Sequence, residues 1–301
     1  RKRGAGHTGF TVIASPEVTL EEDLLRRDLT INAMARDRQG VLVDPFDGQA
    51  DLAGRTFRQV SAAFAEDPLR VFRVARFAAQ MPEFTVAEQT QKTMQQMALS
   101  GELRSLSAER VWQEFRKALE AAEPTRFFTV LADCSGLEDW FAECVQLSPT
   151  SLSEVLRAAT PGEQELASVK FAALPLQEQQ FRQLGQRLRA PKATLQLAED
   201  RCRYIAGLER WSELDGQRLY HLLDALQALH TPTRLLSLLP WLTASGQERL
   251  KTLLLPMLPR LKAVPPRPEN GSTPTGKAYG NALALARSEW LDKWLTQTDS
   301  P

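Results

Sequence analysis

The sequence predicts an α+β protein in which a small mixed sheet near the N-terminus precedes a mostly α-helical chain. Residues 10–14 (FTVIA) and 41–43 (VLV) are short runs of β-branched and other apolar residues that favour strands. From about residue 60 the strand signals fade, and helical patterns interrupted by proline and glycine dominate. At 301 residues and 43% hydrophobic composition, the chain is long enough for two or more domains.

Composition favours a cytoplasmic protein. The sequence holds no apolar run long enough to cross a bilayer and no secretory signal. Cys134, Cys144 and Cys202 have the spacing of neither a disulfide framework nor a zinc site, so we expect reduced thiols in the core. The chain contains three histidines, which argues against a multi-ligand histidine metal site. Its formal net charge is zero, so any RNA contact must come from a local patch.

The first predicted helix begins at Thr19, which forms a capping box with Glu22, and its pattern continues to Ala35. Asp28 and Asn32 are four residues apart and would share one face, with Arg27 beside them. Polar groups among core positions need partners, and a ribose hydroxyl or a phosphate is one possibility. The alternative is an internal Arg–Asp pair that holds this helix against its neighbours. A turn at residues 37–40 then leads from helix to strand.

A second helix contains the most informative pattern in the chain. Its entrance has an N-cap residue followed by proline at the first helical position. One polar stripe carries an acid and three arginines at three-residue intervals: Asp67, Arg70, Arg73 and Arg76. Three guanidiniums on one flank of a half-buried helix repel one another unless an anion neutralises them. A nucleoside triphosphate would do so, with the acid and the first arginine pairing with a base edge. The alternative is a capped helix with a solvated basic face.

These segments, with two others, resemble the class II tRNA nucleotidyltransferases, the CCA-adding enzymes of bacteria, and the related bacterial poly(A) polymerases. Four segments match in the family's order: Arg26–Ala35, Asp44–Gly48, Glu66–Phe77 and Ser107–Trp112. The resemblance implies the remnant of a polymerase-β-like nucleotidyltransferase head with a mixed sheet, followed by a helical neck, body and tail. The implied domains are 1–60 (the C-terminal part of the head), 61–124 (neck), 125–261 (body) and 262–301 (linker and tail helix).

The resemblance also implies a reaction and a set of binding residues. The family adds CCA to the 3′ end of tRNA from CTP and ATP without a nucleic-acid template and releases pyrophosphate. The implied nucleotide-binding residues are Arg27, Asp28 and Asn32 for ribose and phosphates, Asp67 and Arg70 for the base edge, and Arg73 and Arg76 as further ligands. A carboxylate accepts from the exocyclic amine of cytosine or adenine, and a guanidinium donates to ring nitrogens or a carbonyl. The implied partners are tRNA and no membrane, and the implied state is a monomer or homodimer.

The sequence departs from the family pattern at the metal site. Members carry an Asp-x-Asp pair that holds two Mg²⁺ ions, and no such pair precedes Arg27. We therefore expect a fragment that lacks several dozen N-terminal residues, has no catalytic residues or Mg²⁺ ligands of its own, and is inactive. CCA addition would then belong to the parent protein. No His-Asp doublet follows residues 169–174, so we expect the hydrolase domain of the longer members to be missing.

Three alternatives remain open. A poly(A) polymerase of this superfamily usually carries a strongly basic extension, and the zero net charge favours CCA addition instead. An enzyme that adds only A or only CC fits the same motifs. From another class, the chain could be a helical RNA-binding module without catalysis.

Two later segments each have two interpretations. The basic cluster at residues 186–192 would meet a tRNA backbone or form a solvated helix end. The helix that opens at Gly276 would bind phosphate at its N-terminus or pack as a C-terminal helix.

Overall fold

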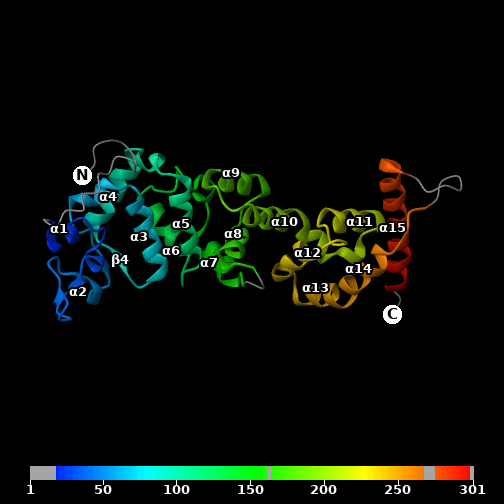
Figure 1. The fold of residues 1–301 in the computed structure, drawn as a ribbon, viewed down its shortest axis with the longest axis horizontal. Helices are drawn as coiled ribbons and strands as arrows, with labels where there is room; N and C mark the ends of the chain where they lie inside the picture. The colour runs from blue at the N-terminus through cyan, green and yellow to red at the C-terminus, as the bar shows by residue number, and fades with distance from the viewer. Residues whose placement is uncertain (1–17, 161–163, 268–274, 299–301) are drawn as a thin grey trace. The chain divides into compact units, whose positions relative to one another are not determined.

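The computed structural model describes residues 18–160, 164–267 and 275–298 (Figure 1). The predicted strand at residues 10–14 lies outside these ranges. The chain divides into two compact units. Unit 1 comprises Arg1–Ala158 and Ala173–Pro191, and unit 2 comprises Ala159–Ala172 and Lys192–Pro301. This division falls inside the predicted body, and the finer boundaries at residues 60, 124 and 261 stay predictions.

Unit 1 contains short strands and helices followed by longer helices. Its short N-terminal elements are α1 (Leu20–Leu25), η2 (Thr30–Asn32), β1 (Ala35–Arg36), β2 (Leu42–Val43), α2 (Gly48–Ala53), β3 (Thr56–Phe57) and η3 (Ala62–Glu66). The remaining elements are α3 (Leu69–Gln80), β4 (Thr85–Val86), α4 (Glu88–Leu99), η4 (Glu102–Ser105), α5 (Ala108–Leu119), α6 (Thr125–Asp133), η5 (Ala142–Cys144), α7 (Pro149–Ala158) and α9 (Glu178–Leu188).

Two strand pairs represent the predicted sheet in the described residues. β1 and β2 are antiparallel, with Ala35 opposite Val43, and the turn at residues 37–40 joins them. The prediction of a strand near 41–43 is confirmed, but the turn links two strands and not a helix to a strand. β3 and β4 pair in parallel, with Thr56 opposite Thr85. The whole of α3 lies between β3 and β4 in the sequence, so this helix forms part of the crossover connection between the two parallel strands.

The prediction of one helix through Ala35 is wrong. The capping box of Thr19 and Glu22 is present, but α1 ends at Leu25. The chain then turns, and the N–H of Thr30 donates to the carbonyl of Arg58 at 2.9 Å. Asp and Asn side chains compete with helical hydrogen bonds through local contacts of their own, which explains why an apparently helical pattern stops here.

The core of unit 1 lies where α3 packs against α5 and α6. Phenylalanine rings from these helices and the chain that follows form a cluster with centroid separations from 4.8 to 6.3 Å: Phe72, Phe115, Phe127, Phe128 and Phe141. Trp112, Phe115 and Leu119 of α5 are buried in this core. This packing fixes one side of α3 and presents its N-terminal arginines to the turn after α1.

Unit 2 is helical throughout its described residues. Its elements are α8 (Leu166–Ala173, ending at the junction of the units), α10 (Lys192–Glu209), η6 (Trp211–Glu213), α11 (Gly216–Ala225), α12 (Thr233–Ser237), η7 (Leu239–Trp241), α13 (Ala244–Arg249), the π-helix η8 (Leu250–Leu254), α14 (Leu255–Lys262) and α15 (Gly276–Thr298). The expected helix from Gly276 is confirmed. α15 packs on α11, where the N–H of Gly216 donates to Asp292 Oδ1 at 2.6 Å.

The cysteine prediction is right for two residues and wrong for the third. Cys134 and Cys144 are buried in unit 1, and burial raises the pKa of each thiol to about 12. Cys202 is exposed on α10. Sequence spacing alone gave no indication of this difference. None of the helices in the described part of the chain is long and apolar enough to cross a membrane.

Candidate functional site

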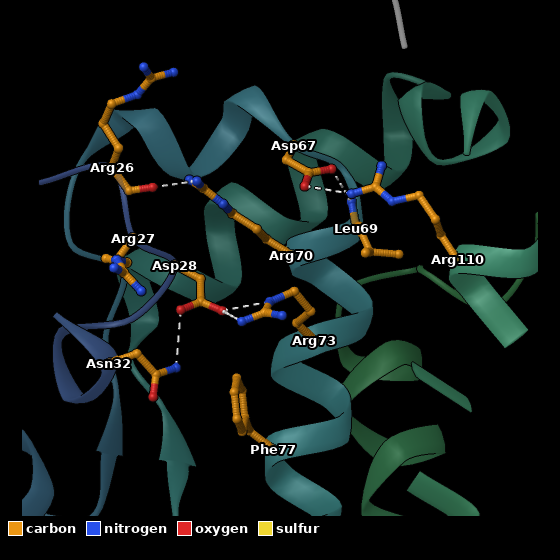
Figure 2. Close-up of a pocket in the computed structure, with 10 residues that line it drawn as sticks. All are labelled: Arg26, Arg27, Asp28, Asn32, Asp67, Leu69, Arg70, Arg73, Phe77 and Arg110. Carbon is orange, nitrogen blue, oxygen red and sulfur yellow. Dashed lines mark hydrogen bonds and ion pairs between the residues drawn. The ribbon is translucent and has the colours of Figure 1, made fainter. Parts of the chain in front are cut away.

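A pocket of about 470 Å³ opens in unit 1 between the turn that follows α1 and the N-terminal half of α3 (Figure 2). Six of the seven predicted binding residues line it: Arg27, Asp28, Asn32, Asp67, Arg70 and Arg73. The pocket adds four residues that sequence reasoning did not assign: Arg26, Leu69, Phe77 and Arg110. Residues up to 84 positions apart in sequence thus meet around one cavity.

Asp67 lies at the entrance of α3, as the capping pattern predicts. Its Oδ1 accepts from the N–H of Leu69 at 3.1 Å, and its Oδ2 accepts from Arg110 at 2.8 Å. The helix begins formally at Leu69, one residue later than predicted. The negative carboxylate therefore sits at the positive end of the α3 dipole. Two protein donors hold it in place at the pocket wall, where its side chain remains 20% exposed.

Arg70 follows one turn later and is held by two backbone carbonyls. Its Nη1 donates to the carbonyl of Ala63 at 2.5 Å, and its Nη2 donates to the carbonyl of Arg26. Burial lowers the pKa of this guanidinium, while the nearby carboxylates of Asp28 and Asp67 act in the opposite direction. A guanidinium has five N–H groups, so these two bonds leave up to three for a ligand.

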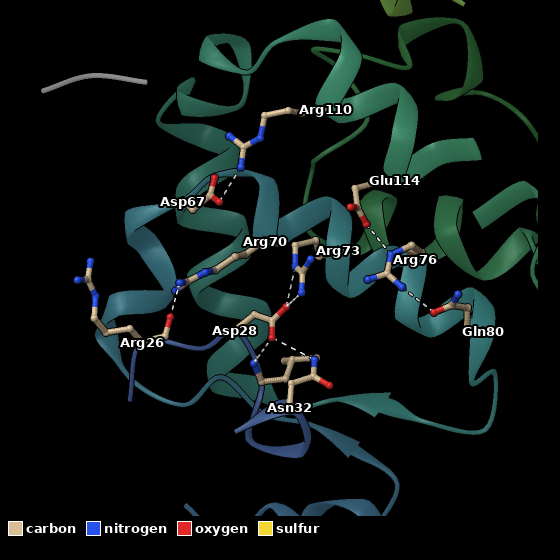
Figure 3. A network of polar contacts seen from close by, with 11 residues as sticks. Arg26, Asp28, Asn32, Asp67, Arg70, Arg73, Arg76, Gln80, Arg110 and Glu114 are labelled. Atoms are coloured by element: carbon tan, nitrogen blue, oxygen red, sulfur yellow. Dashed lines mark hydrogen bonds and ion pairs between the residues drawn. The ribbon is translucent and has the colours of Figure 1, made fainter. Parts of the chain in front are cut away.

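Asp28 is the polar centre of the opposite wall. Its Oδ1 accepts from the N–H of Leu29 at 2.9 Å and from Asn32 Nδ2 at 3.1 Å, and its Oδ2 accepts from Arg73 Nε at 2.7 Å (Figure 3). Burial alone would raise the pKa of Asp28. The charge of Arg73 and these hydrogen bonds outweigh burial, and the pKa lies below its ordinary value. The Asp28–Asn32 contact thus forms in a turn and not across a helix face.

Arg76 is placed away from the pocket. Its guanidinium is buried, and it donates to Glu114 on α5 at 2.5 Å and to Gln80 at 2.7 Å (Figure 3). The guanidinium carbon also lies 3.9 Å from the centre of the Phe77 ring. Arg76 is therefore neither a residue of this pocket nor part of a solvated basic face, but one half of a buried ion pair, and we leave it out of the proposed ligand set.

The pocket is strongly cationic. Five guanidiniums line it against two carboxylates, which gives a formal charge of +3. Two of the arginines have partners outside the cavity, because Arg26 pairs with Glu66 and Arg27 with Asp23. Both of these pairs are well exposed, so water and salt screen them and a polyanionic ligand can compete for the arginines. The arrangement can hold a compact anion that carries hydrogen-bonding edges.

Arg110 is the pocket residue whose omission matters most. It belongs to the segment Ser107–Trp112, near the start of α5, and it pairs with Asp67 across 43 positions of sequence. Ser107 immediately precedes the first residue of α5. The position of the Arg110 side chain in the pocket could not be predicted, because only the packing of α5 against α3 brings Arg110 and Asp67 together.

The described residues contain no group of three or more His, Cys, Asp or Glu side chains that could hold a metal ion. Where the Mg²⁺ expected from the resemblance would bind stays a prediction.

The predicted basic cluster at residues 186–192 is largely neutralised. Arg187 donates to both carboxylate oxygens of Glu143 at 2.7 Å, and Arg189 pairs with Glu109. A contact of this cluster with a tRNA backbone stays a prediction.

Known proteins with similar sequences identify the family. A family model described as "Poly A polymerase head domain" matches residues 5–58, and one described as "Probable RNA and SrmB-binding site of polymerase A" matches residues 83–144. A CCA-adding enzyme of Pseudomonas putida (strain W619) is 40% identical over 309 residues, and the match covers 100% of this chain and 83% of the relative. The chain belongs to the CCA-adding enzyme family.

Other members of this family of nucleotidyltransferases agree over shorter spans. A multifunctional CCA protein of Pseudomonas putida (strain KT2440) is 44% identical over 238 residues, which is 78% of this chain and 64% of that protein. A CCA-adding enzyme of Alteromonas mediterranea is 59% identical over 145 residues, covering 48% of this chain and 36% of its own length.

Solved structures agree on the fold. A CCA-adding enzyme in complex with ATP superposes with a TM-score of 0.62 at 20% identity, covering 93% of this chain and 71% of that one. The Thermotoga maritima CCA-adding enzyme complexed with tRNA gives 0.59 at 21% identity, covering 92% and 73%. The expected architecture, a nucleotidyltransferase head followed by a helical body, is thereby confirmed.

Proposed function

We propose that this protein binds CTP and ATP in the unit 1 pocket and serves the addition of CCA to the 3′ end of tRNA. The observation that carries the proposal is the presence of Asp67 and Arg70, one helical turn apart, in a cationic pocket of about 470 Å³. A cavity of this size lies in the range of about 300–1,000 Å³ that is typical of small-molecule sites.

Asp67 and Arg70 would select the base. A carboxylate offers about four lone-pair sites, and the bonds from Leu69 and Arg110 occupy two of them. The remaining sites can accept from the exocyclic amine of cytosine or adenine, while Arg70 donates to the neighbouring ring atoms. Uracil and guanine present a carbonyl at the corresponding position, which would face the carboxylate without a hydrogen bond. Discrimination therefore comes from leaving buried polar groups unpaired in the wrong complex.

The part of the pocket around Asp28 would hold ribose and phosphates. Asn32 and Arg73 are both positioned by Asp28, and Arg27 lies beside them at the rim (Figure 2). Asp28 is fully engaged with its protein partners, so its role in the proposal is to orient the two donors. Charge-assisted hydrogen bonds from arginine to phosphate are among the stronger contacts available to such a site.

Further parts of the proposal concern groups that the structure does not contain. The substrate RNA would be tRNA, bound mainly through phosphate contacts that weaken as salt rises. Mg²⁺ would be the metal of the reaction, with ligands outside the described residues. We also propose a cytoplasmic protein that is a monomer or homodimer.

Equilibrium binding of the four nucleoside triphosphates tests this proposal without requiring turnover. CTP and ATP should bind more tightly than UTP and GTP, and Arg73→Gln should weaken all four. Equal affinity for the four nucleotides would refute base selection. The family models describe a poly(A) polymerase, which favours a second candidate function. That alternative predicts binding of ATP without comparable binding of CTP.

A further inference from the structure

The turn that carries Asp28 and Asn32 is bonded from behind to α2. Asp28 and Asn32 line the nucleoside triphosphate pocket (Figure 2), whereas Thr30, which lies between them in the sequence, does not. Thr30 is 2% exposed, and its Oγ1 donates to Asp51 Oδ2 of α2 at 2.7 Å. Asp51 also lies outside the pocket. The side chain between the two pocket residues is therefore held by a different element.

Thr30, Asp51 and Arg58 form a closed ring of hydrogen bonds. The N–H of Thr30 donates to the carbonyl of Arg58 at 2.9 Å, and Arg58 Nε donates to both carboxylate oxygens of Asp51 at 3.1 Å. The hydroxyl of Thr30 closes the ring at Asp51. Beside the ring, the N–H of Val60 donates to the carbonyl of Asp28 at 3.3 Å. These bonds fix both the backbone and the side chain of Thr30, and with them the turn.

The helix α2 approaches this turn so closely that its first residue has no room for a side chain. A Cβ at Gly48 would lie 2.4 Å from the carbonyl oxygen of Thr30 and 2.8 Å from Met34 Cγ. Asp51 lies three residues later, on the same face of α2 as Gly48. The close packing at Gly48 therefore brings the Asp51 carboxylate within hydrogen-bond distance of Thr30.

Stability alone does not account for a carboxylate at this place. The side chain of Asp51 is 10% exposed, whereas that of its ion-pair partner Arg58 is 53% exposed. Removing an acid from water for a partner that stays hydrated gains little, and apolar side chains that replace buried ion pairs often give equal or higher stability. A carboxylate provides what an apolar side chain cannot, because it accepts from Thr30 and Arg58 in defined directions.

We propose that Asp51 is a positioning residue for the ribose and phosphate side of the nucleoside triphosphate site. It acts through Thr30 and holds the turn so that Asp28 and Asn32 keep their places in the pocket. The inference rests on the function proposed for this pocket, and it adds α2 to the elements that determine nucleotide affinity. Arg70 is held by other contacts, so Asp51 should affect the affinity for every nucleotide and not the choice of base.

The hydroxyl of Thr30 can be removed with little change in the shape of the side chain. Thr30→Val should weaken the binding of CTP and of UTP by the same factor, about three- to tenfold, because a directional hydrogen bond that fixes the turn is lost. Thr30→Ser keeps a hydroxyl and should restore both affinities. In an Asp51→Ala background, Thr30→Val should have little further effect. Isothermal titration with CTP and UTP measures these affinities, at a temperature where circular dichroism shows each variant to be folded.

Glu143→Gln is the matched control. Glu143 is another acid of unit 1 with a buried side chain, it pairs with Arg187, and it lies outside the pocket. This variant should be less stable in urea but bind CTP as the unaltered protein does, which separates positioning from a general loosening of unit 1.

Three results would overturn the role of Asp51. They are unchanged CTP affinity in Thr30→Val, an equal loss in Thr30→Ser or Glu143→Gln, and a change in the ratio of CTP to UTP affinity in Thr30→Val. The proposed function fails separately. An unaltered protein that binds CTP and UTP equally would refute base selection and leave the comparison of variants intact, and one that binds neither nucleotide would overturn both proposals.

Discussion

Replacing Arg110 by glutamine tests whether the orientation of Asp67 matters for base recognition. The Arg110–Asp67 pair has an N–O distance of 2.8 Å, with side chains 28% and 20% exposed. Exposed ion pairs contribute about 0.2–1 kcal/mol and breaking a buried one costs about 3–5 kcal/mol, so this intermediate pair should contribute about 1–2 kcal/mol. If that coupling orients Asp67 for the base amine, CTP should bind about 5- to 30-fold more weakly. UTP affinity should change little, because uracil has no amine for Asp67 to accept from.

Isothermal titration with CTP and UTP measures both affinities on the same protein. Arg104→Gln is the matched control, because Arg104 is a 78% exposed arginine of unit 1 that pairs with Asp139 outside the pocket. In an Asp67→Ala background, Arg110→Gln should have no further effect on CTP selectivity. The reasoning is refuted if Arg110→Gln leaves CTP affinity intact, or if CTP and UTP affinities fall by the same factor.

Three further predictions concern stability and reactivity. The pKa of Asp28 is depressed in the folded protein, so its ionised carboxylate stabilises unit 1 at pH values above its unfolded pKa of about 3.9. In urea titrations, the excess stability of the unaltered protein over Asp28→Asn should therefore disappear as the pH falls below that value. Gly216→Ala should destabilise unit 2 by about 1–3 kcal/mol in hydrogen exchange, since the new Cβ would lie 2.1 Å from a backbone oxygen of α15. Gly280→Ala, with no atom within 4 Å of the new Cβ, should not. Cys202 should react with a thiol reagent at pH 8 in the native protein, and Cys134, with its pKa of about 12, only after unfolding; equal rates would contradict the assigned burial.

The helix starts could be predicted because their determinants are local. The capping box of Thr19 and Glu22 and the Asp67-Pro68 entrance each act within a few residues. The residue at which the first helix ends could not be predicted in this way. Asp28 finds its main partner in Arg73, 45 positions later, and that contact replaces the helical path that the local pattern favoured. The same limit applies to the pairing of β3 with β4, which joins two-residue strands across the length of α3.

The candidate site was predicted only in part, because local spacing shows which residues share a helix face but not which distant residues pack against it. The three-residue spacing of Asp67, Arg70, Arg73 and Arg76 places them on one stripe, and the first three line the pocket. The stripe turns slowly about the axis, so Arg76 reaches Glu114 on α5 and becomes buried. No local feature marks that change. Arg110 was missed because its position in the pocket depends on how α5 packs.

The most direct test of the account compares the affinities of all four nucleoside triphosphates for the unaltered protein and for Asp67→Ala. The unaltered protein should prefer CTP and ATP, and the variant should lose that preference by about tenfold, mainly through weaker CTP and ATP binding. Glu66→Ala is the control, because Glu66 is the adjacent acid and forms an exposed pair with Arg26. An Asp67→Ala protein that keeps the original ratio of CTP to UTP affinity would contradict base selection by this carboxylate.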